Sequence, residues 1–481
     1  MKSLFNTYIG RCAAICAFFL IASCNKDKLS PEPQTAFSEE QAFANPERIR
    51  QQVFGAYSAI KNGNFLGGRG LVYHDVRGED WLNITGNGVT ALAAWNFSIV
   101  SSDNQTENFW STGYAAINRA NVVLQGLDEN EAKVGQALAN NYRGEMRFLR
   151  AVSYFHLVNT YGRRPFNADN GASPGLPLRL TANKGAATDT INLARSTVAE
   201  VYNQILADLN FAEANLPATY GAAGDTNIVR AHKNSAIAFK TRVYLNMARY
   251  ADVITEANKL VPPTGPYVAP TGVQNRLESS ILNVFRSYSA AGGREMIFGL
   301  PMAQSNGPGT QNGLALYQNA EFALNPTGIL GNAQFSATDV RRTAFVVNTA
   351  PPFRYSKFND DNNNYVPIIR YSEVMLNLAE ALARTNGLDL RAVALLNAVH
   401  QRSDPGTTLA PLTGDDLIST ILTERRIEFL GEGLRSFDIM RQNLPFPAKG
   451  SVTAIPTTAL NYMWPIPASE ILYNKLATQN Q

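Results

Sequence analysis

The sequence predicts a mainly α-helical fold, in which tetratricopeptide-like helical hairpins pack with a loop-rich region containing a few short strands. Two observations carry this prediction. Apolar residues recur at three- and four-residue steps over several long segments, which is the spacing of one buried helix face. By contrast, residues 262–365 are rich in glycine, proline, asparagine and aromatic residues, with breaker pairs such as Pro262-Pro263.

The N-terminal segment, residues 1–23, has the features of a secretory signal peptide. Lys2 and Arg11 are the only charges before Lys26 and Asp27. The apolar stretch at 12–23, CAAICAFFLIAS, is shorter than the roughly 20 residues that span a bilayer. A basic start followed by a short apolar stretch and small residues is typical of an exported protein.

The signal segment ends in IASC at 21–24, which resembles the bacterial lipobox, whose cysteine becomes the lipidated first residue. We therefore expect lipidation at Cys24, with ordinary cleavage near Ala22 as the alternative. The other two cysteines, Cys12 and Cys16, would leave with the signal peptide. No disulfide could then form, so a large core must stabilise the fold.

Cleavage after residue 23 would leave 458 of the 481 residues and lower the formal net charge from +3 to +1. Such a chain lacks the basic footprint of nucleic-acid binders, and it exceeds the roughly 250–300 residues of a single core. We expect a polar tether at 24–37, a helical N-terminal part at 38–261, a loop-rich insert at 262–365 and a C-terminal part at 366–481.

Capping and breaker residues set the expected helix boundaries. Ser38 and Gln41 form a capping-box arrangement, Gly162 ends the third helix, and Asp389 caps the last. Small residues such as Ala379 suit the crossings of tetratricopeptide-like hairpins, although long insertions make the array irregular. The expected helices lie at 38–60, 110–127, 131–161, 192–215, 234–260 with a break near Tyr250, and in a pair that begins at Tyr371 and turns at Asn386-Gly387.

Several stretches, in order along the chain, together resemble the SusD/RagB family of nutrient-binding outer-membrane lipoproteins. The resemblance runs from Cys24 to the C-terminus. The stretches are the lipobox; WSTGY at 110–114 with Ile117 and Asn121; RFLRAVSYF at 147–155 with Tyr161-Gly162; RYSE at 370–373 with 379–381; ERRIE at 424–428 with Gly433, Arg435, Asp438 and Arg441; and WPIP at 464–467 with Glu470 and Asn474.

The resemblance implies a SusD-like α/α fold and a lipid-anchored, surface-exposed protein of the outer membrane. It implies that the chain binds an oligosaccharide without catalysing a reaction and delivers it to a SusC-like, TonB-dependent transporter. No cofactor, metal or nucleic acid is expected. A peptide-capturing relative and a helical scaffold lipoprotein without a small ligand are the alternatives.

The charged residues within these motifs lie among apolar helix positions. Buried charges must be paired, so we expect ion pairs that tie the C-terminal helices to the long third helix. A catalytic acid/base pair is the alternative. The residues are Arg370, Glu373, Glu380, Glu424, Glu428, Arg435 and Asp438.

Two segments outside the predicted helices, 73–110 and 285–322, have the composition of a glycan site. Sugar rings lie on aromatic faces, and their hydroxyls need fixed polar partners, which loops commonly supply. The resemblance implies that an aromatic residue from each segment contacts the sugar, with core packing as the alternative for each. The candidate ligand residues are Tyr73, Arg77, Asp80, Trp81, Trp95, Asn96, Tyr288 and Tyr317.

Motifs for metal binding and for glycoside hydrolysis are weak in this sequence. The four histidines show no paired metal-ligand spacing. Residues 360–364, DDNNN, could offer oxygens to Ca²⁺ but lack the glycine and terminal glutamate of an EF-hand, which favours a solvated loop. A glycoside hydrolase needs two carboxylates about 5–9.5 Å apart. Glu79 and Asp80 are the only loop pair near the aromatic residues, and adjacent residues rarely oppose each other across a substrate.

Overall fold

The structure is a computed structural model that describes residues 39–183, 191–221, 225–285, 294–348, 350–360 and 364–480. The chain divides into two compact units, Met1–Gln52 and Val53–Gln481. The expected signal peptide, lipobox and tether lie outside the described residues. The expected domain boundaries inside the second unit stay a prediction.

The helix expected at 38–60 is two helices. Helix α3 (Glu39–Ala42) ends before helix α4 (Pro46–Ile60) begins. Pro46 stands at the first position of α4, where its missing N–H and fixed φ fit a helix start but not a helix interior. A continuous helix through this position would lose a backbone hydrogen bond, which explains the break.

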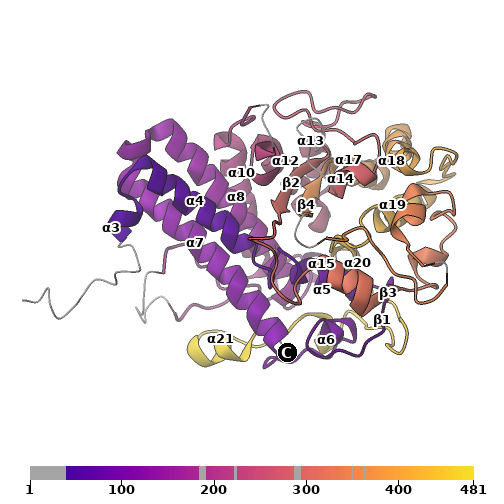
Figure 1. Ribbon diagram of the computed structural model, residues 1–481, viewed down its shortest axis with the longest axis horizontal. Coiled ribbons are helices and arrows are strands. Elements are labelled where there is room, and N and C mark those ends of the chain that lie inside the picture. Colours follow the sequence, from indigo (N-terminus) through magenta and orange to yellow (C-terminus); the bar gives the residue numbers. More distant parts are fainter. Residues whose placement is uncertain are drawn as a thin grey trace, which may run out of the picture. The chain divides into compact units, whose positions relative to one another are not determined.

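Helices make up most of the second unit (Figure 1), so the mainly α-helical prediction is confirmed. The longer helices are α7 (Asn104–Val134), α8 (Gln136–Tyr161), α10 (Val198–Asn215), α12 (Lys233–Asn246), α13 (Tyr250–Ala257), α17 (Tyr371–Asn386), α18 (Leu390–Ser403) and α19 (Gly414–Glu428). The shorter elements are α5 (Arg69–Val76), α6 (Leu92–Trp95), α9 (Phe166–Asp169), α11 (Thr226–Val229), α14 (Leu282–Phe285), α15 (Leu314–Leu316), η2 (Tyr317–Glu321), η3 (Ile329–Gly331), α16 (Val340–Phe345), α20 (Arg435–Met440), η4 (Leu460–Tyr462) and α21 (Ala468–Tyr473).

Neighbouring helices along the chain pack as hairpins, as predicted. Helix α7 lies against α8, α12 against α13, and α17 against α18 (Figure 1). Gly135, with a φ of 79°, joins α7 to α8 and places their boundary later than the sequence predicted. The turn after α17 uses Gly387, and the Asp389 side chain caps α18 by accepting a hydrogen bond from the Ala392 N–H at 2.9 Å.

The apolar face predicted for the third helix is the centre of the core. Met146, Val152 and Phe155 of α8 are each fully buried. The Phe155 ring makes edge contacts with Phe239 of α12, with ring centroids 5.3 Å apart, and with Phe437 of α20, at 5.5 Å. Helix α8 therefore contacts helices from both the N-terminal and the C-terminal parts of the chain.

Two short antiparallel sheets connect the loop-rich segment to the rest of the second unit. Strand β1 (Trp81–Asn83) pairs with β3 (Phe322–Leu324), and β2 (Met296–Pro301) pairs with β4 (Tyr365–Arg370). The few short strands predicted within 262–365 are therefore present. Strand β3 pairs with β1, far earlier in the chain, and β2 pairs with β4, which begins at the last residue of the segment. Backbone pairing fixes the position of loops that have few helices of their own.

The charges in the C-terminal motifs are buried and paired, as predicted. Glu380 accepts two hydrogen bonds from Arg441 at 2.6 and 2.7 Å, and Asp438 bridges Arg441 and Arg425. Glu373 accepts a bidentate pair from Arg242 at 2.6 Å.

The predicted partner helix for these charges is wrong. Their partners lie on α12 and α16 to α19, between α19 and α20, directly after α20, directly before β2 and after α5. Among the described residues, none lies on the long helix α8. Charged residues of α8 have other partners. Arg150 pairs with Asp208 of α10 at 2.7 Å, and Glu145 pairs with Arg230 at 2.5 Å. Periodicity predicted that the charges are buried, but it could not identify partners distant in sequence.

Among the described residues, no helix combines the length and the apolarity needed to cross a bilayer.

The Arg242–Glu373 pair gives a stability prediction. Glu373→Ala leaves the buried Arg242 guanidinium without its carboxylate, which should lower the free energy of unfolding by about 3–5 kcal/mol in urea denaturation. The matched control is Asp252→Ala, which breaks the exposed Arg249–Asp252 pair at 2.8 Å and should cost at most about 1 kcal/mol. Equal losses in the two variants would contradict a special role for the buried pair.

Candidate functional site

The two segments predicted to carry the ligand site lie side by side. Trp81 opposes Leu324 and Asn83 opposes Phe322 in the antiparallel β1–β3 pair. The Ile84 N–H extends this pairing by donating to the backbone carbonyl oxygen of residue 321 at 3.2 Å. The chain therefore brings 73–110 and the end of 285–322 to one edge, although more than 200 residues separate the two strands.

A polar loop follows β1 at this edge, and Glu321 holds it in place. The Glu321 carboxylate accepts hydrogen bonds from Thr85 Oγ1 at 2.6 Å, Asn87 Nδ2 at 3.1 Å and Thr90 Oγ1 at 3.2 Å. Glu321 itself is 7% exposed, whereas Val89 in the loop is 63% exposed. A buried carboxylate thus fixes an exposed loop of amides and hydroxyls, which we call the 83–90 loop.

Sequence reasoning missed Glu321. Its only local signal is a carboxylate directly before the apolar strand β3, which many surface positions share. Its role depends on three side chains from a loop more than 200 residues earlier in the chain.

The two predicted ligand tryptophans lie in the interior, not on exposed loops. Trp81 is 2% exposed and its ring packs edge-on against Tyr355, with centroids 5.8 Å apart. Trp95 is 7% exposed and its Nε1–H donates to the Trp81 carbonyl at 2.8 Å. The ammonium of Lys449 lies 5.6 Å from the Trp95 ring centroid. The expectation of surface loops is wrong at both positions, because they form β1 and α6.

Tyr73 and Arg77 are also interior residues, because the segment expected to be a loop forms helix α5. The Tyr73 ring packs on Trp464, with centroids 5.1 Å apart. The Arg77 guanidinium lies 5.1 Å from the Phe97 ring and 4.5 Å from the Phe446 ring. Burial lowers the pKa of Arg77 to about 10, and it still donates to the Tyr462 carbonyl.

Asp80 and its neighbour Glu79 are held by arginines. Asp80 accepts from Arg426 at 2.5 and 2.9 Å and from the Ile329 N–H at 2.7 Å. Glu79 accepts from Arg435 at 2.5 and 3.0 Å. Burial raises the pKa of Glu79, but Arg435 and Arg426 outweigh it and leave the pKa below its ordinary value. Both carboxylates fix the start of β1 to the C-terminal helices.

Tyr317 and Trp81 line one small cavity of about 10 Å³, together with Asp75 and Gln318. This volume is enough for about one water molecule. Burial raises the pKa of Asp75 to about 7, while the Gly433 N–H partly opposes that rise. The structure thus brings one predicted aromatic from each segment together, but in a cavity too small for a sugar.

The two remaining predicted site residues are Asn96 and Tyr288. Asn96 is half-buried, and its Oδ1 accepts from the Ser98 N–H and hydroxyl. Tyr288 lies outside the described residues. Direct ligand contact by the eight predicted residues stays a prediction, and the interior packing of six of them favours structural roles for those six.

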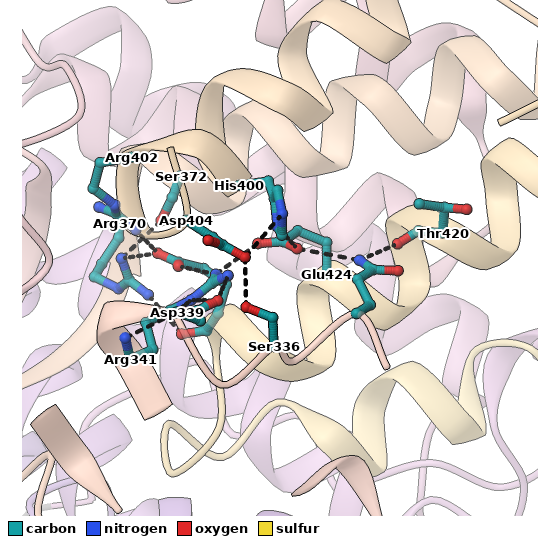
Figure 2. A network of polar contacts seen from close by, with 12 residues as sticks. Ser336, Asp339, Arg341, Arg370, Ser372, His400, Arg402, Asp404, Thr420 and Glu424 are labelled. Atoms are coloured by element: carbon teal, nitrogen blue, oxygen red, sulfur yellow. Dashed lines mark hydrogen bonds and ion pairs between the residues drawn. The ribbon is translucent and has the colours of Figure 1, made fainter. Parts of the chain in front are cut away.

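A larger charge network lies in the C-terminal part of the chain (Figure 2). Arg341 bridges Asp339, Glu424 and Glu428 at 2.6–2.9 Å, with all four side chains at 0% exposure. His400 Nδ1 lies 2.9 Å from Glu424. Burial raises the pKa of Glu424, but Arg341 and then His400 more than offset this, so its pKa lies below its ordinary value. An ionised, fully paired carboxylate is suited to fixing structure rather than to transferring a proton.

In the described part of the chain, no three His, Cys, Asp or Glu side chains come together in a way that could hold a metal ion. His74 and His156 are core residues with ring centroids 6.1 Å apart. Burial holds the pKa of each below its ordinary value. Residues 361–363 of the DDNNN segment lie outside the described residues, and Asn364 is buried rather than solvated.

Comparisons with known proteins match most of the chain to SusD-like proteins. Residues 31–245 match the family model described as "Starch-binding associating with outer membrane", and residues 325–481 match the model of the SusD family. SusD-like protein P2 of Formosa agariphila is 24% identical, over 93% of this chain and 94% of the relative.

Solved structures of SusD superfamily and SusD-like proteins share the fold of this chain. A SusD superfamily protein from Bacteroides fragilis is 32% identical, with a TM-score of 0.79, over 91% of this chain and 99% of that one. A SusD superfamily protein from Bacteroides thetaiotaomicron is 24% identical, with a TM-score of 0.79, over 91% and 100%. A laminarin-binding SusD-like protein is 21% identical, with a TM-score of 0.68, over 91% and 99%.

The buried Asp75 predicts how stability changes with pH. Its pKa is about 7 in the folded chain, compared with an ordinary value of 3.8, so the folded state binds the proton more tightly. Its contribution to stability is therefore complete below about pH 4 and is lost as pH rises to about 7. Asp75→Asn should raise the free energy of unfolding by about 1–3 kcal/mol at pH 8 and change it little at pH 4.

Urea denaturation at the two pH values measures this difference. The control is Asp415→Asn, which alters an exposed carboxylate in the first turn of α19. A stability gain for Asp75→Asn that is the same at pH 4 and pH 8 would contradict a buried, protonated Asp75.

Proposed function

The chain belongs to the SusD family, and on that premise we propose that it is a glycan-binding subunit of a nutrient uptake complex. It captures an oligosaccharide at the cell surface and delivers it to a SusC-like, TonB-dependent outer-membrane transporter. It is held on the outer membrane by lipid at Cys24 and catalyses no reaction itself.

The 83–90 loop and its support by Glu321 are the structural observation that favours this function. Sugar hydroxyls require polar partners whose positions are fixed before binding, because ordering them on binding costs free energy. Thr85 donates its hydroxyl proton to Glu321, but its oxygen can still accept from a ligand, and the Asn87 amide keeps a second N–H to donate. The loop that carries them is held in place by three hydrogen bonds and a strand pair. The exposed Ile84 and Val89 add apolar surface beside them.

Carboxylate positions favour binding without catalysis. The pair directly before β1, Glu79 and Asp80, is engaged by Arg435 and Arg426. Glycoside hydrolysis needs one carboxyl group with a raised pKa facing a second across the substrate. Glu79 instead has a pKa below its ordinary value. The second candidate function, capture of a peptide, differs only in the ligand and is decided by the same binding measurement.

Calorimetry of the chain without residues 1–24 tests the ligand class. We expect at least one neutral hexasaccharide from a panel of β-1,3-glucan, α-1,4-glucan and xylan fragments to bind. Thr85→Ala with Asn87→Ala should weaken that binding about tenfold, equal to about 1.4 kcal/mol. The control, Ser419→Ala on the exposed face of α19, should bind as the unmodified chain does. Binding of peptides with no binding of any glycan would contradict the glycan assignment.

Lipid attachment has its own test. Cys24→Ser should abolish incorporation of a radiolabelled fatty acid and move the protein from the outer-membrane fraction to the soluble fraction, since several acyl chains anchor far more firmly than one. Affinity purification of the unmodified protein from detergent-solubilised outer membranes should recover a TonB-dependent barrel. A mature protein that begins elsewhere and carries no acyl chain would contradict the anchor.

A further inference from the structure

A cavity of about 750 Å³ lies away from the 83–90 loop, between helix α7 and two extended segments, 178–183 and 192–193. This volume lies within the range of about 300–1,000 Å³ that is common for sites of small ligands. Tyr114, Ile117 and Asn118 form its floor on successive turns of α7. None of the residues predicted or described above as a ligand site lines it.

Side-chain amides fix the shape of this cavity. The amide of Asn118 exchanges two hydrogen bonds with the backbone of Asn183, at 2.7 and 3.1 Å. One turn later, Asn121 Nδ2 donates to the backbone carbonyls of Arg179 and Thr181 at 2.9 and 3.2 Å. The wall formed by 178–183 is therefore bonded to α7 at both ends.

The segment at 192–193 is held by Asn474 and Lys475, which directly follow helix α21. Asn474 accepts from the Leu193 N–H at 2.9 Å and donates to the Leu193 carbonyl at 2.7 Å. Asn192 Oδ1 accepts from the Lys475 N–H at 2.7 Å. The Nδ2 of Asn192 and the hydroxyl of Thr181 make no hydrogen bond within the described part of the chain, so both are available to a ligand.

The charge of the lining is neutralised. Arg179 is the one charged side chain among the described lining residues. Its guanidinium is 3.2 Å from Glu470 and 5.9 Å from the Tyr114 ring centroid. A paired cation attracts an anionic ligand weakly. The lining therefore favours a neutral ligand.

The rim of the cavity is apolar and exposed. Leu180 is 39% exposed and Leu193 is 36% exposed, and both line the cavity. Tyr114 of α7 adds an aromatic ring to the lining. Apolar and aromatic surface next to fixed amides and a hydroxyl matches a ligand with apolar CH faces and many hydroxyl groups.

We propose that this cavity is a second binding site for a neutral oligosaccharide, separate from the 83–90 loop. The chemical class of its ligand rests on the proposed function, but its location does not. The chain would then bind two segments of a glycan, or two glycan molecules, at two separate sets of residues. Two linked contacts raise the apparent affinity for a long glycan because the second contact forms at a high effective concentration.

Hydrogen exchange of the full mature chain with laminarihexaose, maltohexaose or xylohexaose, each at saturation, tests the location. We expect slower amide exchange at 178–183 and 192–193 in addition to 83–90. Protection at the cavity alone would support this site and overturn the 83–90 loop as a site. Protection at the 83–90 loop alone would overturn the second site, and protection at neither, with all three sugars, would overturn both.

A blocking variant tests the stoichiometry by calorimetry. Thr181→Trp places a large ring at the exposed edge of the cavity, while the backbone carbonyl that Asn121 bonds stays in place. We expect two hexasaccharides per unmodified chain and one per Thr181→Trp chain, at an unchanged melting temperature. The control, Leu412→Trp at a position 82% exposed outside the cavity, should keep two. Two bound hexasaccharides in Thr181→Trp would overturn the second site.

Discussion

Paired buried charge is the constraint on which the rest of the second unit depends. Arg370 at the end of β4 contacts Glu295, Glu428 and Glu432, and Arg402 of α18 contacts Glu295 and Glu428. These five side chains are at most 4% exposed. Removing one charge from such a group leaves another buried and unpaired, at a cost of several kcal/mol. The network therefore holds helices α18 and α19, the end of β4 and the loop-rich segment in one arrangement.

The same type of contact positions the candidate site. Asp80 and Glu79 fix the start of β1 to α19 and α20 through Arg426 and Arg435. The β1–β3 pair then brings Glu321 to the 83–90 loop. Loops carry function best where a rigid scaffold holds them. The scaffold here is a set of helices that ion pairs lock together, and the site needs no regular structure of its own.

The sequence predicts the parts of this molecule that follow from local rules. The apolar face of α8, the cap at Asp389 and the burial of the C-terminal charges all come from periodicity or from one turn of helix. The resemblance to the SusD/RagB family identified the fold and the family. Composition also identified both segments that meet at the β1–β3 edge.

The remaining features depend on contacts between residues distant in sequence. Trp81 and Trp95 are buried because Tyr355 and Lys449 pack on them, and no pattern near either tryptophan indicates those partners. Glu321 acquires its role from three side chains far earlier in the chain. An aromatic residue in a polar segment therefore does not by itself predict whether its side chain is exposed.

The most direct test of the account is a crystal structure of the mature chain with a neutral oligosaccharide that it binds in solution. We predict an intact sugar on the exposed face of the 83–90 loop, with Thr85 or Asn87 within hydrogen-bond distance and Glu321 still bonded to the loop. A sugar bound elsewhere with that loop empty, or a cleaved sugar, would contradict it.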